Sequence, residues 1–277
     1  METSEIKKNV REGYAAVAKQ GATCCGSGSS CCGTNAPGSV SSAIGYSADD
    51  LASVPDGANL GLGCGNPIAL ASLKEGEIVL DLGSGAGFDC FLAAKRVGPS
   101  GRVIGVDMTP EMLDRARENA LSGDYKNVEF RLGEIENLPV ADNSIDAIIS
   151  NCVINLSPDK PRVFAEAFRV LKPGGRVMVS DIVLLAALPE AVRNSVEAYV
   201  SCIAGAMRID EYLRTIRDAG FKNVKIVEET TFPVDFITGD PTAQAIIKDN
   251  NITQEAVNGF ANSVLSVRVQ ATRPQVS

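Results

Sequence analysis

The stretch 78–89, with the sequence IVLDLGSGAGFD, constrains the fold more than any other part of the chain. Strand-forming residues run into a loop in which glycine occupies every second position, at Gly83, Gly85 and Gly87, and a helix-forming segment follows at 91–97. Glycine lets the backbone turn sharply and approach a ligand closely, because it has no Cβ. The stretch therefore predicts a strand, a tight turn and a helix, with a ligand bound at the turn.

An acidic residue ends the next predicted strand, at 103–107. Asp107 follows Gly87 by about 20 residues, the distance at which a strand-end carboxylate binds ribose hydroxyls. The G-x-G-x-G spacing, with Asp81 just before it, differs from the G-x-G-x-x-G of dinucleotide-binding proteins. Together these features resemble motif I of the class I S-adenosylmethionine-dependent methyltransferases. The resemblance implies a Rossmann-like sheet that binds S-adenosylmethionine.

The rest of the chain alternates between helical and strand patterns. Besides the segments above, helices are expected at 4–19, 48–54, 110–121, 161–171, 189–207, 209–219 and 254–262, and strands at 128–132, 145–150, 176–183, 221–227 and 265–271. Such alternation builds a parallel sheet through right-handed crossovers. We predict an α/β fold with helices on both faces of the sheet, plus a Cys-rich N-terminal segment and helical insertions. The predicted regions are an N-terminal helix and loop (1–60), the methyltransferase core (61–230), and a C-terminal helix with a closing strand (231–277).

The composition excludes several classes of function. The chain carries 26 Lys and Arg against 34 Asp and Glu, a net charge of -8, which argues against a nucleic-acid partner. It has neither an apolar run of about 20 residues nor the apolar start of a signal peptide, so we expect no membrane partner and a cytoplasmic location. Histidine is absent, which removes the commonest general base and metal ligand. Any reaction must use carboxylates, amines or thiols, or need no base.

Eight cysteines in a reducing compartment are better interpreted as thiols or soft-metal ligands than as disulfides. Four of them form adjacent pairs in the Gly/Ser-rich stretch 21–42, which we expect to be a mobile loop: Cys24, Cys25, Cys31 and Cys32. Adjacent pairs do not match the C-x-x-C spacing of zinc knuckles, so a structural zinc is weakly supported. Cys90 lies inside the helix after the glycine loop and is expected to be structural.

Three further cysteines are singled out by their positions. Cys64 lies in a glycine-rich loop, Cys152 follows the fourth strand, and Cys202 falls on a helix predicted to include 192–202. Ligands of open α/β sheets bind at the carboxyl ends of the strands, and all three thiols can converge there. Three thiolates without histidine favour a soft ion. Trivalent arsenic binds three sulfurs in a pyramid and keeps a lone pair that can attack a sulfonium methyl group without a base.

Three segments now carry a more specific resemblance: 64–67 (CGNP), 81–91 and 150–160 (SNCVINLSPDK). They look like the arsenite S-adenosylmethionine methyltransferase (ArsM) family, over roughly 63–235. The segment around Cys152 is the specific part, because the glycine loop is shared by all class I methyltransferases. The family implies that arsenite, or its thiol conjugate, is held by Cys64, Cys152 and Cys202 and is methylated, with thioredoxin or glutathione as thiol reductant.

The resemblance also implies a set of cofactor contacts. These are Asp81, Gly83, Ser84, Gly85 and Gly87 around the methionine moiety, Asp107 and Met108 at the ribose and adenine, Glu134 and Ile135 at the adenine, and Asn151 near the site. The family usually has an N-terminal cysteine that pairs with the equivalent of Cys64 when arsenic is oxidised. Here Cys24, Cys25, Cys31 and Cys32 are all candidates for that redox role.

Two other functions stay open on the sequence. One is a class I methyltransferase for a small organic acceptor of the quinone or sterol type, which would need a base rather than three thiols. The other is a thiol-rich protein that sequesters a metalloid without turnover. Acidic residues flanking the turn before the fourth strand invite a metal interpretation, but we expect them to face solvent: Glu134, Glu136, Asp142 and Asp146.

Overall fold

The computed structural model describes residues 3–20, 37–67, 72–187, 202–231 and 263–275 of the 277-residue chain. Within these residues one sheet has the order β3-β2-β1-β4-β5-β7-β6. Its strands are β1 (Ile78–Leu82), β2 (Arg102–Asp107), β3 (Val128–Leu132), β4 (Ile145–Asn151), β5 (Leu171–Leu184), β6 (Lys222–Thr231) and β7 (Val264–Thr272). Only β7 runs antiparallel to its neighbours, and the order reverses between β1 and β4. The predicted α/β class I methyltransferase fold is confirmed.

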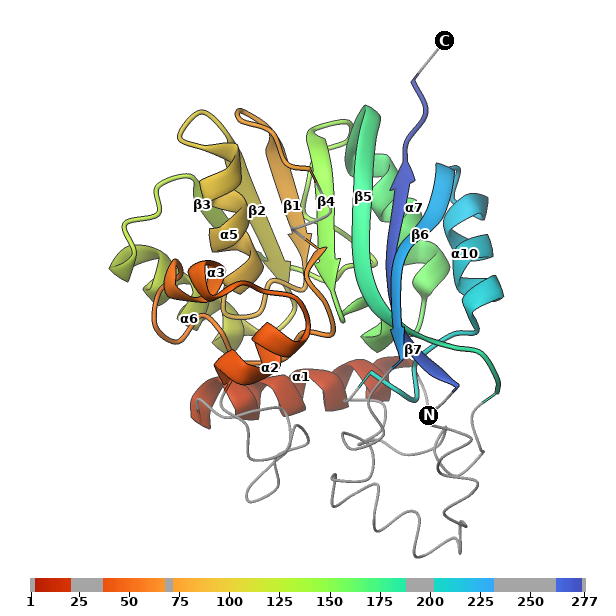
Figure 1. The fold of residues 1–277 in the computed structure, drawn as a ribbon, viewed down its shortest axis with the longest axis horizontal. Coiled ribbons are helices and arrows are strands. Elements are labelled where there is room, and N and C mark those ends of the chain that lie inside the picture. The colour runs from red at the N-terminus through yellow and green to blue at the C-terminus, as the bar shows by residue number, and fades with distance from the viewer. Residues whose placement is uncertain (1–2, 21–36, 68–71, 188–201, 232–262, 276–277) are drawn as a thin grey trace, which may run out of the picture.

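Helices cover both faces of the sheet (Figure 1). They are α1 (Thr3–Gln20), α2 (Pro37–Ala43), α3 (Ala48–Ala52), α5 (Phe88–Val97), α6 (Pro110–Ser122), α7 (Lys160–Val170) and α10 (Ile209–Asp218), with a short 3-10 turn, η1 (Ile154–Leu156). Side chains alternate between the two faces along each strand. Val79 and Ile149 therefore pack with α5 and α6, whereas Leu80 and Ile148 pack with α7 and α10.

The register brings three strand ends to one level. Leu82 of β1 lies beside Val106 of β2 and Ser150 of β4, so the glycine loop, Asp107 and Asn151 all begin at the same edge. In Figure 1, α1 runs across the molecule below this edge. Arg115 of α6 donates to the Ala18 carbonyl of α1 at 3.0 Å and holds the helix there. The fold thus makes a cavity between the strand ends and α1.

The structure corrects several predicted boundaries. Residues 37–43, predicted as loop, form α2, which starts at a proline, a residue suited to the first helical turn. The helix predicted to 207 does not include 202–207: the chain forms turns at 202–205, and the Met207 carbonyl then accepts the Leu184 amide at 2.9 Å, which places it beside the end of β5. The helix after the glycine loop starts at 88, and β5 starts at 171. The predicted helix 254–262 and residues 188–201 lie outside the described residues.

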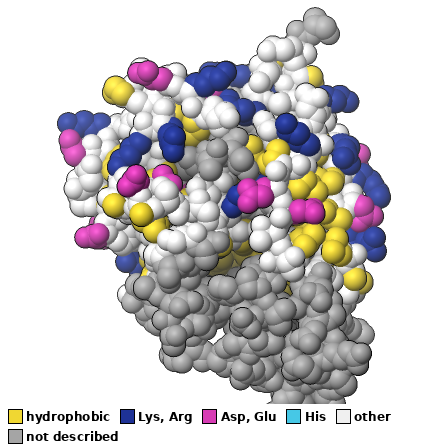
Figure 2. All heavy atoms as spheres, viewed as in Figure 1, with side chains coloured by type: hydrophobic (Ala, Val, Ile, Leu, Met, Phe, Trp, Pro, Cys, Tyr) yellow, Lys and Arg dark blue, Asp and Glu magenta, His cyan; other side chains and the backbone are white. Residues whose placement is uncertain are grey.

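In the described ranges, no helix combines the length and the apolar character needed to cross a bilayer. Figure 2 shows basic and acidic side chains interspersed over one face of the molecule. The sheet, its two helical layers and the edge beneath α1 therefore supply the frame in which the candidate site is built.

Candidate functional site

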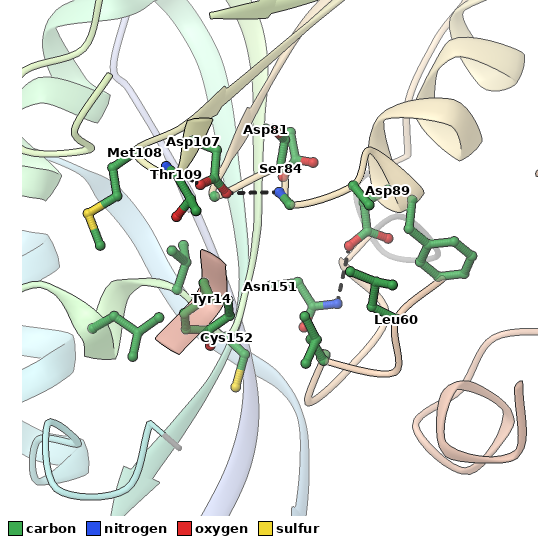
Figure 3. Close-up of a pocket in the computed structure, with 18 of the residues that line it drawn as sticks. Tyr14, Leu60, Asp81, Ser84, Asp89, Asp107, Met108, Thr109, Asn151 and Cys152 are labelled. Atoms are coloured by element: carbon green, nitrogen blue, oxygen red, sulfur yellow. Dashed lines mark hydrogen bonds between the residues drawn. The ribbon is translucent and has the colours of Figure 1, made fainter. Parts of the chain in front are cut away.

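A cavity opens where the strand order reverses between β1 and β4, the usual ligand position of an open α/β sheet. Its wall comes from the loops after β1, β2 and β4, from residues 58–63, and from Lys7, Val10 and Tyr14 of α1. Figure 3 shows Asp81, Ser84, Asp107, Met108, Asn151 and Cys152 around it. Most of the predicted site residues therefore meet in one place.

The glycine loop forms the wall at the end of β1. Gly83 has a φ of 72°, and a Cβ there would overlap the side chain of Val153. Gly85 has a φ of 50°, but a Cβ built on it meets no other protein atom within 4 Å. Gly87, the N-cap of α5, is backed by Phe91 and Phe130 and does not line the cavity. The loop thus presents bare backbone around Gly85 to a ligand.

Asp107 is fixed by the backbone on both sides. Its carboxylate accepts the Gly85 amide at 2.9 Å and the Thr109 amide at 2.8 Å, one on each oxygen. Burial raises the pKa of Asp107. The Thr109 side chain and the Met108 amide also bond to this carboxylate, so it is held firmly at the end of β2.

Two more carboxyl groups stand behind the glycine loop. Asp81 accepts a hydrogen bond from the Cys90 thiol at 3.2 Å, and burial raises its pKa well above the ordinary value. Asp89 accepts the Tyr46 hydroxyl at 2.6 Å, and burial raises its pKa to about 6. Within the part of the chain that the structure describes, neither these carboxyl groups nor Asp107 forms a salt bridge with Lys or Arg. This uncompensated acidity suits a cationic ligand such as a sulfonium.

The three predicted thiols are buried and lie in one apolar cluster. The Cys202 thiol donates to the Cys152 carbonyl at 2.9 Å, and the Cys64 thiol donates to the Ser180 carbonyl at 3.5 Å. Cys152 also lines the cavity. Hydrogen bonds to the thiols of Cys202 and Cys64, together with burial, raise the pKa of Cys152 well above its usual range, and burial raises that of Cys64. Without a guest the thiols of Cys64 and Cys152 therefore favour the protonated form.

Two of the thiols occupy unusual backbone. Cys152 has a φ of 58° and Cys202 a φ of 67°, both in the left-handed region. For residues with a Cβ this region costs roughly 1–2 kcal/mol per residue. The Cys152 amide donates to the Ser180 carbonyl at 2.8 Å, which holds the turn in place. The turn aims Cys152 past the end of β4 instead of along it.

Asn151 joins the two halves of the cavity. Its side-chain oxygen accepts the Cys64 amide at 3.1 Å, and its nitrogen donates to the Gly65 carbonyl at 2.8 Å and to Asp89 at 3.2 Å, the last bond being drawn in Figure 3. Its predicted cofactor contact stays a prediction. What the side chain does in this structure is to hold the loop that carries Cys64.

The acidic residues after β3 are arranged differently from the expectation. Glu134 does not line the cavity and pairs with Lys7 of α1 at 2.7 Å. Glu136, expected to face solvent, is buried because it accepts the Ser157 hydroxyl at 2.6 Å and pairs with Lys7 at 3.2 Å. Ile135 lines the cavity, and its contact with the adenine stays a prediction. Asp142 is exposed, and Asp146 is half-buried beside Lys172.

Sequence reasoning missed four polar residues near the thiols and the acids: Tyr46, Asp89, Lys160 and Asp181. Asp181 has an exposed fraction of 0%, and one of its oxygens lies with the sulfurs of Cys64 and Cys152 in a group spanning at most 4.8 Å. A polar pair inside the apolar run of β5 was the available signal for Asp181. The predicted redox cysteines Cys24, Cys25, Cys31 and Cys32 lie outside the described residues.

Comparisons with known proteins agree with this geometry. A family profile described as a methyltransferase domain matches residues 73–220. Arsenite methyltransferase of Halobacterium salinarum is 53% identical over 84% of this chain and 62% of its own, and the human enzyme is 33% identical over 81% and 60%. The crystal structure of an arsenic(III) S-adenosylmethionine methyltransferase from Chlamydomonas reinhardtii superposes with a TM-score of 0.62 at 34% identity, covering 86% of this chain and 74% of that one. The chain spans about three fifths of the length of these curated relatives.

Proposed function

The chain belongs to the arsenite methyltransferase family, and from this premise we propose that it transfers the methyl group of S-adenosylmethionine to arsenic(III) held by Cys64, Cys152 and Cys202. One observation carries the proposal: three buried thiols gather at the end of a cavity whose other end has the glycine loop and acids of a cofactor site. Cys152 belongs to both, since it lies in the thiol cluster and lines the cavity.

Protonated thiols suit the capture of arsenite. For each bond, one As–O bond breaks, one As–S bond forms, and the thiol proton leaves with the hydroxide as water. The raised pKa values of Cys64 and Cys152 keep those protons in place until arsenic arrives. No general base is consumed, which agrees with a chain that has no histidine.

The cofactor supplies a methyl group on a positively charged sulfur when it is bound. The bare backbone at Gly85 and the carboxylate of Asp107 fit such a group, through close approach and opposite charge. The thiols of Cys64, Cys152 and Cys202 would hold arsenic with its lone pair facing the bound cofactor, which would supply the methyl group and leave as the neutral thioether. The contribution of the chain is positioning rather than acid-base catalysis.

Transfer raises arsenic from the trivalent to the pentavalent state, so two electrons must return before another methyl group is added. We assign these to thiols, two of which release two electrons and two protons as they form a disulfide. A reductant of the thioredoxin or glutathione type would then restore the thiols. The family resemblance suggests that this disulfide forms between Cys64 and one of the four N-terminal cysteines.

An anaerobic incubation tests the proposal. Purified protein is mixed with arsenite, S-adenosylmethionine and excess glutathione, and arsenicals are separated and detected by elemental mass spectrometry. We expect methylated arsenic, lost in Cys152→Ser while cofactor binding by calorimetry is retained. Cofactor binding without any methylated arsenic would contradict the proposal and favour an organic acceptor, whereas arsenite binding without turnover would favour sequestration.

A further inference from the structure

A carboxyl group stands beside two of the thiols and gives that end of the cavity a second possible ligand set. Ser180 of β5 pairs with Asn151 of β4, so the residues that follow, Asp181 and Cys152, meet across the strand ends. One ligand atom from each of Cys64, Cys152 and Asp181 lies within 4.8 Å of the others, and all three residues are buried. We call these three residues the mixed triad. Cys202 is not part of it.

We propose that the mixed triad binds a thiophilic divalent cation of the Zn²⁺ or Cd²⁺ class, through two thiolates and one carboxylate. Zinc takes sulfur and oxygen ligands together in a tetrahedron and leaves the fourth position to water when the protein supplies three. Ligands about 2.3 Å from a tetrahedral metal are about 3.8 Å apart. The triad is therefore within about 1 Å of closing on an ion, a movement that side-chain rotation supplies.

The surroundings of Asp181 hold its carboxyl group in place. The Tyr212 hydroxyl donates to one oxygen at 3.1 Å, and the Ile182 amide donates to the other at 3.1 Å. A carboxylate oxygen that accepts one hydrogen bond can still bind a metal, and such bonds to a ligand usually strengthen metal binding. These hydrogen bonds thus orient the carboxyl group and leave its oxygens able to bind a metal ion.

The charges of the site balance with a divalent ion. Two thiolates, one carboxylate and a divalent cation sum to one negative charge, and Lys160 offers one positive charge. Lys160 is 7% exposed, donates to the Ser157 carbonyl at 2.9 Å, and interacts electrostatically with Asp181. A neutral total matters because an uncompensated buried charge is strongly unfavourable.

With arsenic(III) bound, the charges of the same site also sum to zero, but through different groups. Three thiolates cancel the charge of arsenic, and the charge of Asp181 is offset by its electrostatic interaction with Lys160. The two guests therefore share Cys64 and Cys152 but differ in the third ligand, which is Cys202 for arsenic and Asp181 for the divalent cation. They must exclude each other. This inference goes beyond the proposed function and does not need turnover to be tested.

The test uses the full-length chain with Cys24, Cys25, Cys31 and Cys32 replaced by serine, so that these thiols do not bind the probe. Cadmium binding is followed by its ultraviolet charge-transfer absorption, and arsenite binding by calorimetry. Asp181→Asn should weaken cadmium binding at least tenfold while arsenite affinity changes by less than about threefold. Cys202→Ser should do the opposite, and Cd²⁺ should displace arsenite from the parent protein.

X-ray absorption at the zinc edge of the parent protein keeps the inference testable if Asp181→Asn does not fold. Two sulfurs at about 2.3 Å, completed by oxygen, are expected. A first shell of three sulfurs would show that Cys202 binds the ion and would overturn the proposal. So would cadmium affinity that is unchanged in a folded Asp181→Asn protein, or no cadmium binding to the parent.

Discussion

The two ends of the cavity are built by opposite means. The cofactor end comes from consecutive residues of one strand-turn-helix unit, together with Asp107 at the end of the neighbouring strand, whose carboxylate accepts backbone amides. The thiol end is assembled from three loops separated by 88 and 50 residues, counted from Cys64 to Cys152 and from Cys152 to Cys202. Local chain geometry thus fixes the first end, and tertiary packing fixes the second.

The ends also differ in charge. Asp81, Asp89 and Asp107 bring three carboxyl groups to the cofactor end of the cavity, which favours a cation. At the thiol end, three sulfurs lie in an apolar cluster, and the carboxyl group of Asp181 interacts electrostatically with Lys160. A substitution at one end should therefore weaken binding of the ligand of that end and leave binding at the other end unchanged. Four changes can break or sharpen this division.

Cys64→Ser should have the largest effect. Losing one of three thiolate ligands should weaken arsenite binding by more than about a hundredfold, beyond the 10- to 100-fold typical of losing an outer partner of a ligand. Cofactor affinity should change by less than about threefold. Calorimetry with each ligand separately measures both. Cys90→Ser is the matched control, since its thiol contacts Asp81 instead and arsenite binding should survive it.

Asp107→Asn should act at the other end. It removes a charged acceptor and sets an amide nitrogen against a backbone N–H, so cofactor affinity should fall by about 10- to 100-fold, as expected for a hydrogen bond to a charged group. Arsenite affinity should be unchanged. Asp142 is exposed, so Asp142→Asn is the control and should change neither the cofactor affinity nor the arsenite affinity. If arsenite binding fell in parallel with cofactor binding, the division between the two ends would be wrong.

Asn151→Ala tests the residue at the boundary. Because its side chain holds the Cys64 loop by hydrogen bonds to Cys64 and Gly65, we expect arsenite affinity to fall about tenfold and cofactor affinity by less than threefold. Asn119→Ala is its counterpart, since Asn119 donates to the Ala86 carbonyl in the glycine loop at 3.0 Å. Loss of this hydrogen bond should lower the affinity for the cofactor and leave the affinity for arsenite unchanged. Equal effects of Asn151→Ala on both ligands would show that it serves the cofactor as well.

Acidification should produce the smallest effect. The pKa of Asp89 is about 6, so lowering the pH through that value removes a negative charge and should weaken cofactor binding about threefold, while arsenite binding changes less. Since this pKa lies above that of the unfolded chain, protonated Asp89 favours folding below about pH 4, and that stability is lost as the pH rises through 6. Asp89→Asn should flatten the binding profile. A profile that keeps its shape would assign the titration to Asp81 or Asp107.

How far the sequence predicts the site follows the same division. The glycine loop, Asp107 and the strand order were predictable because strand-turn-helix units and crossover rules are local. The three thiols were singled out only by reasoning about strand ends and by family resemblance. Asp181 was missed because a polar residue inside an apolar run gives no signal of which partner it will meet. Lys160 and Tyr46 lie in polar segments where nothing in the sequence indicates burial.

The predicted end of the helix at 207 and the predicted exposure of Glu136 were wrong for a related reason. The segment 202–207 has a helical pattern, yet it forms turns and ends beside β5, because the Met207 carbonyl accepts the Leu184 amide. Glu136 was expected in solvent, yet Lys7 and Ser157 give it buried partners from distant parts of the chain. In both cases a tertiary contact overrides the local preference.

The left-handed backbone at Cys152 and Cys202 has a bearing on protein engineering. Glycine adopts this conformation without the penalty that a Cβ brings, so a screen for heat resistance would favour glycine at both positions. Such variants would keep the sheet and lose the sulfur that the chemistry needs. Resistance to heat and metalloid capture therefore compete at these two residues, and thermostability should be sought elsewhere in the chain.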